Sequence, residues 1–115
     1  GEIAIAPVEW SITDSTDTVQ LETRPTDPYS INIWAASTGK DLYIATGSDG
    51  ATWTSYIEDS PSVRLRVGQQ LYSLQAISIS DVTEREKVSS AYVKKYDLEE
   101  DNWVREARIY RLDRL

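Results

Sequence analysis

One stretch decides the fold of this 115-residue chain: Ser30-Ile-Asn-Ile-Trp-Ala-Ala-Ser37, then Thr38-Gly-Lys-Asp41, then Leu42-Tyr-Ile-Ala-Thr46. In its first part, positions 31, 33 and 35 are apolar and share one face, while Trp34 belongs to the other. This period of two predicts a strand whose two faces meet different surroundings. Gly39 suits a turn position with positive φ, so the stretch predicts a hairpin of strands 30–37 and 42–46.

The chain after this hairpin predicts a short helix and a second pair of strands. Thr52 is placed to cap the helix. One stripe of that helix, with i, i+3 and i+4 spacing, consists of Trp53, Tyr56 and Ile57. Alternating apolar residues at 63–67, a turn at Gly68 and a run at 71–80 then predict two strands.

The two ends of the chain complete the pattern. Val8–Thr13 and Thr18–Arg24 alternate and predict a hairpin, after which Pro25 and Pro28 interrupt the sheet. Asp81-Val-Thr-Glu84 is a capping box that opens a helix to about Tyr96. The buried stripe of that helix is expected to be Val88, Ala91, Tyr92 and Tyr96, and residues 103–112 form a last strand.

These elements predict a mainly β protein: an antiparallel barrel of six or seven strands with one main helix before the last strand. The length fits a single domain over residues 1–115, with 1–7 as a flexible lead-in.

Composition excludes several kinds of chemistry. A net charge of −7 opposes binding to nucleic acid, and any phosphate-bearing ligand needs a local cationic pocket. The chain has no His and no Cys, which excludes imidazole acid–base chemistry, thiol catalysis and the usual zinc sites. No stretch is long and apolar enough to predict a membrane span.

The sequence begins at Gly1 and contains no Met. We therefore expect that a segment such as a signal peptide or membrane anchor precedes it in the full-length protein. The expected location is extracytoplasmic, either periplasmic or membrane-anchored.

Several short motifs, in this order, resemble a known group of proteins. They are Leu21-Glu-Thr-Arg24, Ile33-Trp34, Leu42-Tyr-Ile44, Trp53, Ser60-Pro-Ser-Val-Arg-Leu-Arg-Val67, Ala91-Tyr-Val-Lys-Lys-Tyr96 and Ala107-Arg-Ile-Tyr-Arg-Leu112. From about Thr18 onward the chain resembles the DUF2255 group and the deazaflavin-dependent nitroreductase-like proteins. Both belong to the flavin-binding split β-barrels typified by pyridoxamine 5′-phosphate oxidase.

The resemblance implies a Greek-key split barrel, a homodimer and a flavin (FMN or a deazaflavin) held between subunits. By position, Arg24 is the candidate contact for the phosphate or the flavin ring. Hydroxyls of Thr46, Ser48 and Thr52 are candidates for the phosphate site, and Trp34 or Trp53 could stack on an aromatic ring. The chain departs from the pattern in that no Lys closely follows Ser48, while Asp49 adds a repelling charge.

Each candidate also has a structural interpretation. Arg24 could pair with Asp27 or Glu22, and Trp34 could pack in the core or a dimer interface. Trp53 could hold the short helix to the core, and the 46–52 segment could be a plain surface loop.

Two functions therefore stay open at this point. The first is a flavin-dependent oxidoreductase that passes a hydride to a small acceptor. The second is a non-catalytic split-barrel module that binds an apolar or aromatic small molecule, or only its partner subunit. No metal is expected in either case.

Overall fold

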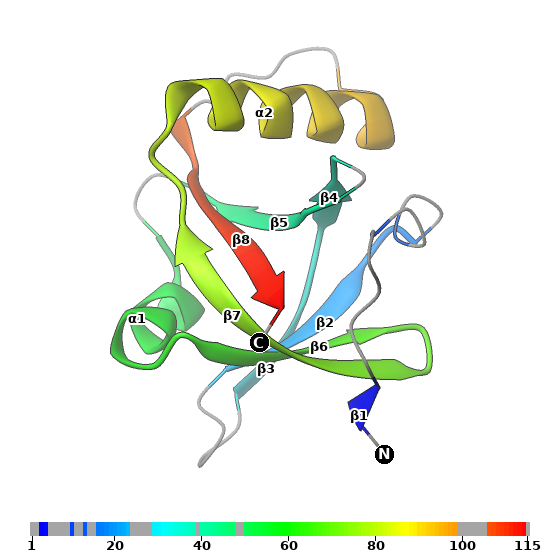
Figure 1. Cartoon of the computed structure of the whole chain (residues 1–115), viewed down its shortest axis with the longest axis vertical. Coiled ribbons are helices and arrows are strands. Elements are labelled where there is room, and N and C mark those ends of the chain that lie inside the picture. Colours follow the sequence, from blue (N-terminus) through cyan, green and yellow to red (C-terminus); the bar gives the residue numbers. More distant parts are fainter. Residues whose placement is uncertain are drawn as a thin grey trace.

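The computed structural model describes residues 3–4, 10, 13, 16–23, 29–38, 40–47, 50–98 and 106–114 (Figure 1). Its strands are β1 (Ile3–Ala4), β2 (Val19–Thr23), β3 (Tyr29–Ile33), β4 (Ala35–Ser37), β5 (Leu42–Thr46), β6 (Ser62–Val67), β7 (Gln70–Ser78) and β8 (Arg108–Arg114). Its helices are α1 (Thr52–Asp59) and α2 (Val82–Tyr96). The fold class is as predicted: mainly β, with the longer helix before the last strand.

Seven of the described strands form a curled antiparallel half-barrel in the order β3-β2-β6-β7-β8-β5-β4, and β1 pairs in parallel with the start of β7. The two ends of this order, β3 and β4, are consecutive in the chain and separated only by Trp34. The predicted strand 30–37 is therefore two strands with a bend between them. One segment pairs with β2 before the bend and with β5 after it, which curls the sheet back on itself.

Strand β5 is buried on both faces, which explains its continuous apolar sequence. Leu42 and Ile44 face the core inside the barrel, which also contains Leu21, Leu65 and Leu74. A second core lies between the sheet and α2, which crosses the barrel at the top of Figure 1. It is formed by Ala36, Tyr43, Ala45, Ile79, Val88, Tyr92, Ala107 and Ile109.

Three side chains of α2 satisfy the backbone at the bend, where the regular ladder stops. The Tyr92 hydroxyl donates to the Trp34 carbonyl at 3.3 Å, and the Lys95 ammonium donates to the Ala35 carbonyl. The Tyr96 hydroxyl accepts from the Ala35 amide at 3.1 Å and lies 2.7 Å from the Asp17 carbonyl, to which it can donate. Because buried backbone groups need partners, these contacts hold the bend in place.

The first turn of α2 is held to the sheet by charge. Asp81 accepts from the Glu84 amide at 2.9 Å, as the capping box predicts, and α2 ends at Tyr96. The Glu84 carboxylate does not complete the box. It accepts instead from the Tyr43 hydroxyl at 2.7 Å and from the Arg111 guanidinium at 2.9 Å. Arg111 also donates to Asp113 at 2.6 Å, so the four side chains satisfy one another.

Two sequence-based predictions of local structure differ from the structure. Most of the predicted strand Val8–Thr13 lies outside the described residues, but its predicted pairing with β2 is wrong, because both edges of β2 are occupied by β3 and β6. The hairpin partner of β2 is β3, and the segment 24–28 with its two prolines lies outside the described residues. Thr52 is not a cap but the first residue of α1, whose N-cap is Ala51.

The contacts at the bend predict the effect of removing one hydroxyl. Tyr96→Phe should lower the free energy of unfolding by about 1 to 3 kcal/mol, because the buried Ala35 amide loses its acceptor. Urea denaturation followed by far-UV circular dichroism measures the change. Tyr29→Phe is the control, since the Tyr29 ring packs on Tyr56 and is retained. Equal stability of the Tyr96→Phe and parent proteins would contradict the role given to the hydroxyl.

Candidate cofactor site

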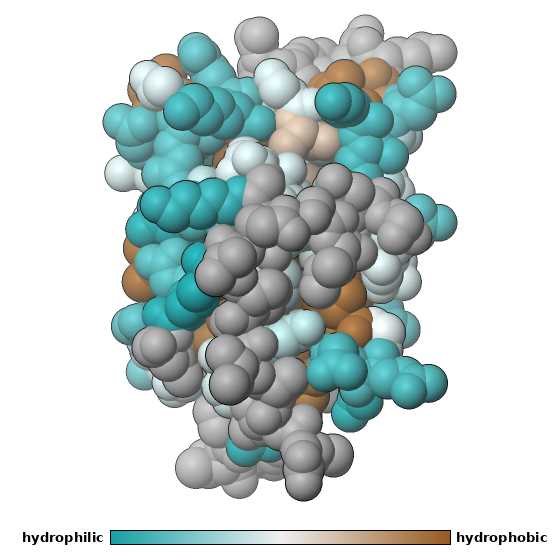
Figure 2. Space-filling view, turned by 45° about the vertical axis from the view of Figure 1, so that its right-hand side comes forward, coloured by the Kyte–Doolittle hydropathy of each residue, from teal (hydrophilic) through white to brown (hydrophobic). Residues whose placement is uncertain are grey.

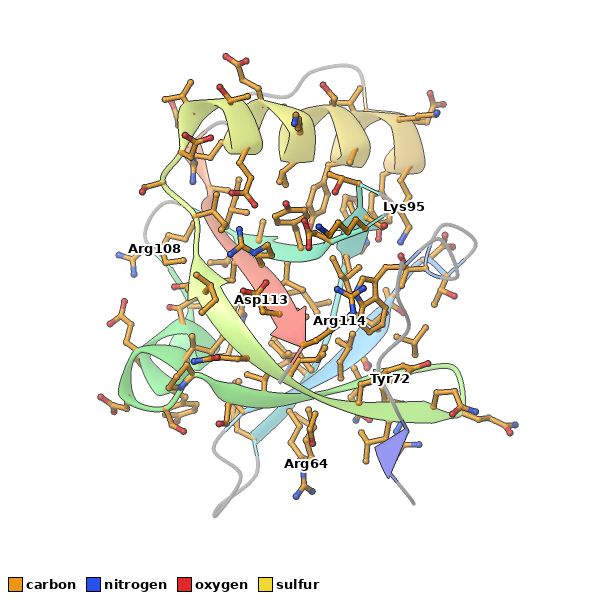
Figure 3. All side chains as sticks on the ribbon, in the orientation of Figure 1. Arg64, Tyr72, Lys95, Arg108, Asp113 and Arg114 are labelled. Carbon is orange, nitrogen blue, oxygen red and sulfur yellow. The ribbon has the colours of Figure 1, made fainter. Side chains whose placement is uncertain are left out.

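The segment between β5 and α1 meets a cation from the far end of the chain. Thr46, at the end of β5, pairs in register with Arg108 at the start of β8. The Arg108 guanidinium lies so close to Gly50 that a Cβ there would be 3.1 Å from Nη1. Thr46 and the residue Gly50 just before α1 therefore lie beside Arg108, although Arg108 is far from both in the sequence. Figure 3 shows Arg108 projecting from β8 away from the barrel.

The backbone of this segment is tightly turned before α1. The Gly50 amide donates to the Gly47 carbonyl at 2.9 Å, and Gly50 has φ +81°. Thr54 then closes the first turn, because its hydroxyl accepts from the Ala51 amide at 3.1 Å and donates to the Ala51 carbonyl at 2.6 Å. The first-turn amides of a helix favour a negative charge, as does the Arg108 guanidinium beside Gly50.

Arg108 forms an ion pair with Glu58 of α1 at 3.5 Å and a side-chain hydrogen bond with Tyr110. The Arg108 and Glu58 side chains are 44% and 63% exposed, and an ion pair so open to water contributes little to stability. An incoming phosphate could therefore replace Glu58 at small cost. Arg108 is the residue that sequence reasoning missed, because the register of β5 on β8 that brings it here has no local sequence signal.

Trp34 lies at the bend, with 41% of its surface exposed. Its ring stacks on Tyr96, with centroids 4.1 Å apart and planes 7° from parallel. Behind Tyr96 lies the buried Tyr92 ring at 5.8 Å, and the Lys95 ammonium is 5.0 Å from the Tyr96 centroid. Burial raises the pKa of both tyrosines above its ordinary value, so their hydroxyls stay protonated as donors. The exposed indole is thus backed by a rigid aromatic stack.

Trp34 and Thr46 lie at the same end of the β4–β5 hairpin but on opposite faces. Ala35, which follows Trp34, pairs with Ile44, two residues before Thr46. By alternation Trp34 faces α2 with Ala36, whereas Thr46 shares the face of Ile44. The structure therefore brings Thr46 and Gly50 beside Arg108, leaves Thr52 exposed at the start of α1, and places Trp34 on the other face of the hairpin from Thr46.

The remaining sequence-predicted residues fall into two groups. Trp53 is only 5% exposed and packs edge-on against Tyr110, with centroids 5.8 Å apart, which fits its structural interpretation as a core contact of α1. Arg24 and Ser48 lie outside the described residues. In the described part of the chain, no cluster of three or more acidic side chains is arranged to hold a metal, and neither helix could span a membrane.

No protein-family model and no curated protein matches the sequence, but solved structures match most of the chain. An FAD-binding protein from Mesorhizobium loti matches with TM-score 0.67 and 14% identity, over 91% of this chain and 86% of that one. HutZ, the heme storage protein from Vibrio cholerae, matches with TM-score 0.71 and 12% identity, over 91% and 86%. An F420-H2 dependent reductase matches with TM-score 0.70 and 13% identity, over 85% and 95%.

These similarities show that the chain has the split-barrel fold typified by pyridoxamine 5′-phosphate oxidase. At such identities the likeness defines the fold and leaves the ligand to be argued from the residues of this chain.

Gly50 tests the contact between the loop and Arg108. Gly50→Ala should destabilise the fold by about 1 to 2 kcal/mol, because alanine disfavours positive φ and its Cβ would lie 2.9 Å from Thr54 Oγ1. Gly47→Ala is a matched control in the same loop, since a Cβ there has no atom within 4 Å. Thermal melts of the two variants measure the difference. Equal melting temperatures for the two would contradict the loop geometry.

Proposed function

We propose that this protein is a flavin-dependent oxidoreductase that binds FMN or a deazaflavin. The observation that supports the proposal most is the position of Arg108 beside the Thr46–Thr52 segment. The sequence lacks a lysine after Ser48, and Arg108 supplies the cation that a phosphate needs there. The resemblance to the DUF2255 and deazaflavin-dependent nitroreductase-like groups favours the same class of cofactor.

A heme is a weaker candidate for this chain. Among the structurally similar proteins, HutZ is described as a heme storage protein. The usual protein ligands of heme iron are His, Cys and Met, with Tyr as a rarer one, and this chain contains none of the first three. A flavin needs no side-chain ligand, because it is held by hydrogen bonds, stacking and contacts to its phosphate.

Different residues of the chain would contact the phosphate and the ring of the flavin. Arg108 and the first-turn amides of α1 would hold the phosphate, with hydroxyls of Thr46 and Thr52 as further donors. When bound, the flavin supplies the hydride chemistry, so the protein needs no imidazole or thiol of its own. The exposed Trp34 would stack on the flavin or the substrate ring.

A homodimer would bring these parts together. Trp34 and Thr46 lie on opposite faces of one hairpin, so a single chain does not bring both to one ligand. A second copy could place its Trp34 against the phosphate loop of the first, and the family resemblance implies a homodimer with the flavin held between subunits.

The extracytoplasmic location stays a prediction that cell fractionation would test.

The second candidate function is a split-barrel module without catalysis. Two observations favour it: Glu58 already pairs with Arg108, and Asp49 adds a negative charge to the loop sequence. Such a module would bind an aromatic small molecule at Trp34 or only its partner subunit.

A flavin titration separates the two functions. FMN and a deazaflavin mononucleotide are titrated into the purified protein, with flavin fluorescence and melting temperature as readouts. We expect saturable quenching and a raised melting temperature, and an affinity about tenfold weaker for Arg108→Gln, which loses a charge-assisted contact. Arg66→Gln is the control, because Arg66 is an exposed arginine of β6 paired across from Gln20. Unquenched fluorescence with an unchanged melting temperature for both flavins would favour the non-catalytic module.

A further inference from the structure

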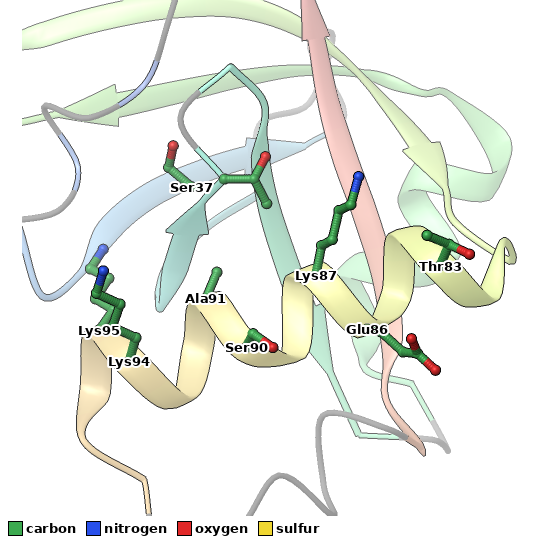
Figure 4. A pocket seen from close by; sticks show the side chains of 9 residues that line it. Ser37, Thr83, Glu86, Lys87, Ser90, Ala91, Lys94 and Lys95 are labelled. Carbon is green, nitrogen blue, oxygen red and sulfur yellow. The ribbon is translucent and has the colours of Figure 1, made fainter.

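A groove of about 910 Å³ lies between α2 and the β4–β5 hairpin (Figure 4). Ser37 and Thr38 of the hairpin form one side. The other side is one stripe of α2, formed by Thr83, Glu86, Lys87, Ser90, Ala91, Lys94 and Lys95. The stripe lies beside the buried face of α2, which contains Val88 and Tyr92. The groove shares no lining residue with the Arg108 loop.

The charge of the groove is opposite to that of the whole chain. Three lysines and one glutamate line it, whereas the chain carries a net charge of −7. Lysines in the last turn of a helix are explained by its dipole, which accounts for Lys94 and Lys95. That explanation does not apply to Lys87, two turns from the end of α2. No salt bridge between described residues involves Lys87 or Lys94.

The arrangement along α2 sets the size of a ligand. Lys87 and Lys94 are seven residues apart, a rise of about 10 Å along the axis, with the small Ser90 and Ala91 between them. Lys95 is held by the Ala35 carbonyl and so forms a fixed end of the groove. The Lys87 and Lys94 ammonium groups can both contact one ligand that lies over the small Ser90 and Ala91 side chains. The Ser90 hydroxyl adds a donor from α2.

The rest of the surface limits what that ligand can be. Figure 2 shows hydrophilic side chains gathered over the top of the molecule, where α2 lies, with only small apolar patches. An extended polyanion such as nucleic acid would reach beyond the groove and be repelled by a chain whose net charge is −7. A compact anion touches only the groove.

We propose that the groove formed by Lys87, Lys94, Lys95 and the hairpin residues Ser37 and Thr38 binds a small molecule carrying two or more phosphate-type charges. Lys87 and Lys94 contact separate anionic groups, and the Ser90 hydroxyl between them donates to the same ligand. The proposal stands independently of flavin binding, because its residues and its face of the molecule differ from those of the Arg108 loop.

The test uses inorganic pyrophosphate as the probe and the protein without added flavin. Backbone amide chemical shifts are followed by NMR during the titration. Inorganic phosphate, which has one phosphate group instead of two, is the comparison ligand. We expect saturable shifts at Thr38, Lys87, Ser90 and Lys94, and tighter binding of pyrophosphate than of phosphate. Lys87→Gln and Lys94→Gln should each weaken pyrophosphate binding about tenfold.

Arg66→Gln is the matched control, since it removes one exposed positive charge from the sheet rather than from α2. Its pyrophosphate affinity should equal that of the parent. The proposal is overturned by linear, non-saturable shifts, or by equal weakening in Arg66→Gln and the lysine variants. It is also overturned if a single-stranded oligonucleotide binds the same residues as tightly as pyrophosphate does.

Discussion

The fold depends on how one chain segment is bent at Trp34. Strands β3 and β4 are the two ends of the strand order, and the bend between them curls the sheet into a half-barrel. A bend interrupts the ladder and leaves backbone groups that must find partners away from water. Tyr92, Lys95 and Tyr96 of α2 provide those partners at Trp34 and Ala35. The same helix thus covers the outer core and fixes the point where the sheet turns.

This constraint also places the surfaces that can bind ligands. The bend exposes Trp34 and stacks it on Tyr96, which is itself held by its hydroxyl. The hydrogen bond from Lys95 to the Ala35 carbonyl holds the last turn of α2 beside the β4–β5 hairpin. The groove lined by Lys87, Lys94 and Lys95 lies between that helix and the hairpin. On the opposite face, the register of β5 on β8 brings Arg108 to the loop before α1. Two distinct cationic sites therefore follow from one arrangement of helix and hairpin.

Local sequence signals predicted the elements well and their partners poorly. Alternation predicted β6, the Asp81 capping box predicted the start of α2, and the turn residue Gly39 predicted the hairpin that includes β4 and β5. The pairing of β2 with β3, rather than with residues 8–13, depends on long-range packing that no local pattern encodes. Arg108 was missed for the same reason, because it is 62 positions from Thr46 in the sequence but its neighbour in the sheet. The tyrosines of α2 were expected as core residues, and their spacing gave no sign that their hydroxyls hold the bend.

Amide hydrogen exchange at Ala35 tests this account most directly. Its N–H is bonded to a side-chain hydroxyl of α2 rather than to a neighbouring strand. Protection comparable to that of Leu65 in the barrel core is therefore predicted, and it should be lost selectively at Ala35 in Tyr96→Phe while Leu65 stays protected. Rapid exchange at Ala35 in the parent protein, or unchanged protection there in Tyr96→Phe, would contradict the claim that α2 holds the bend.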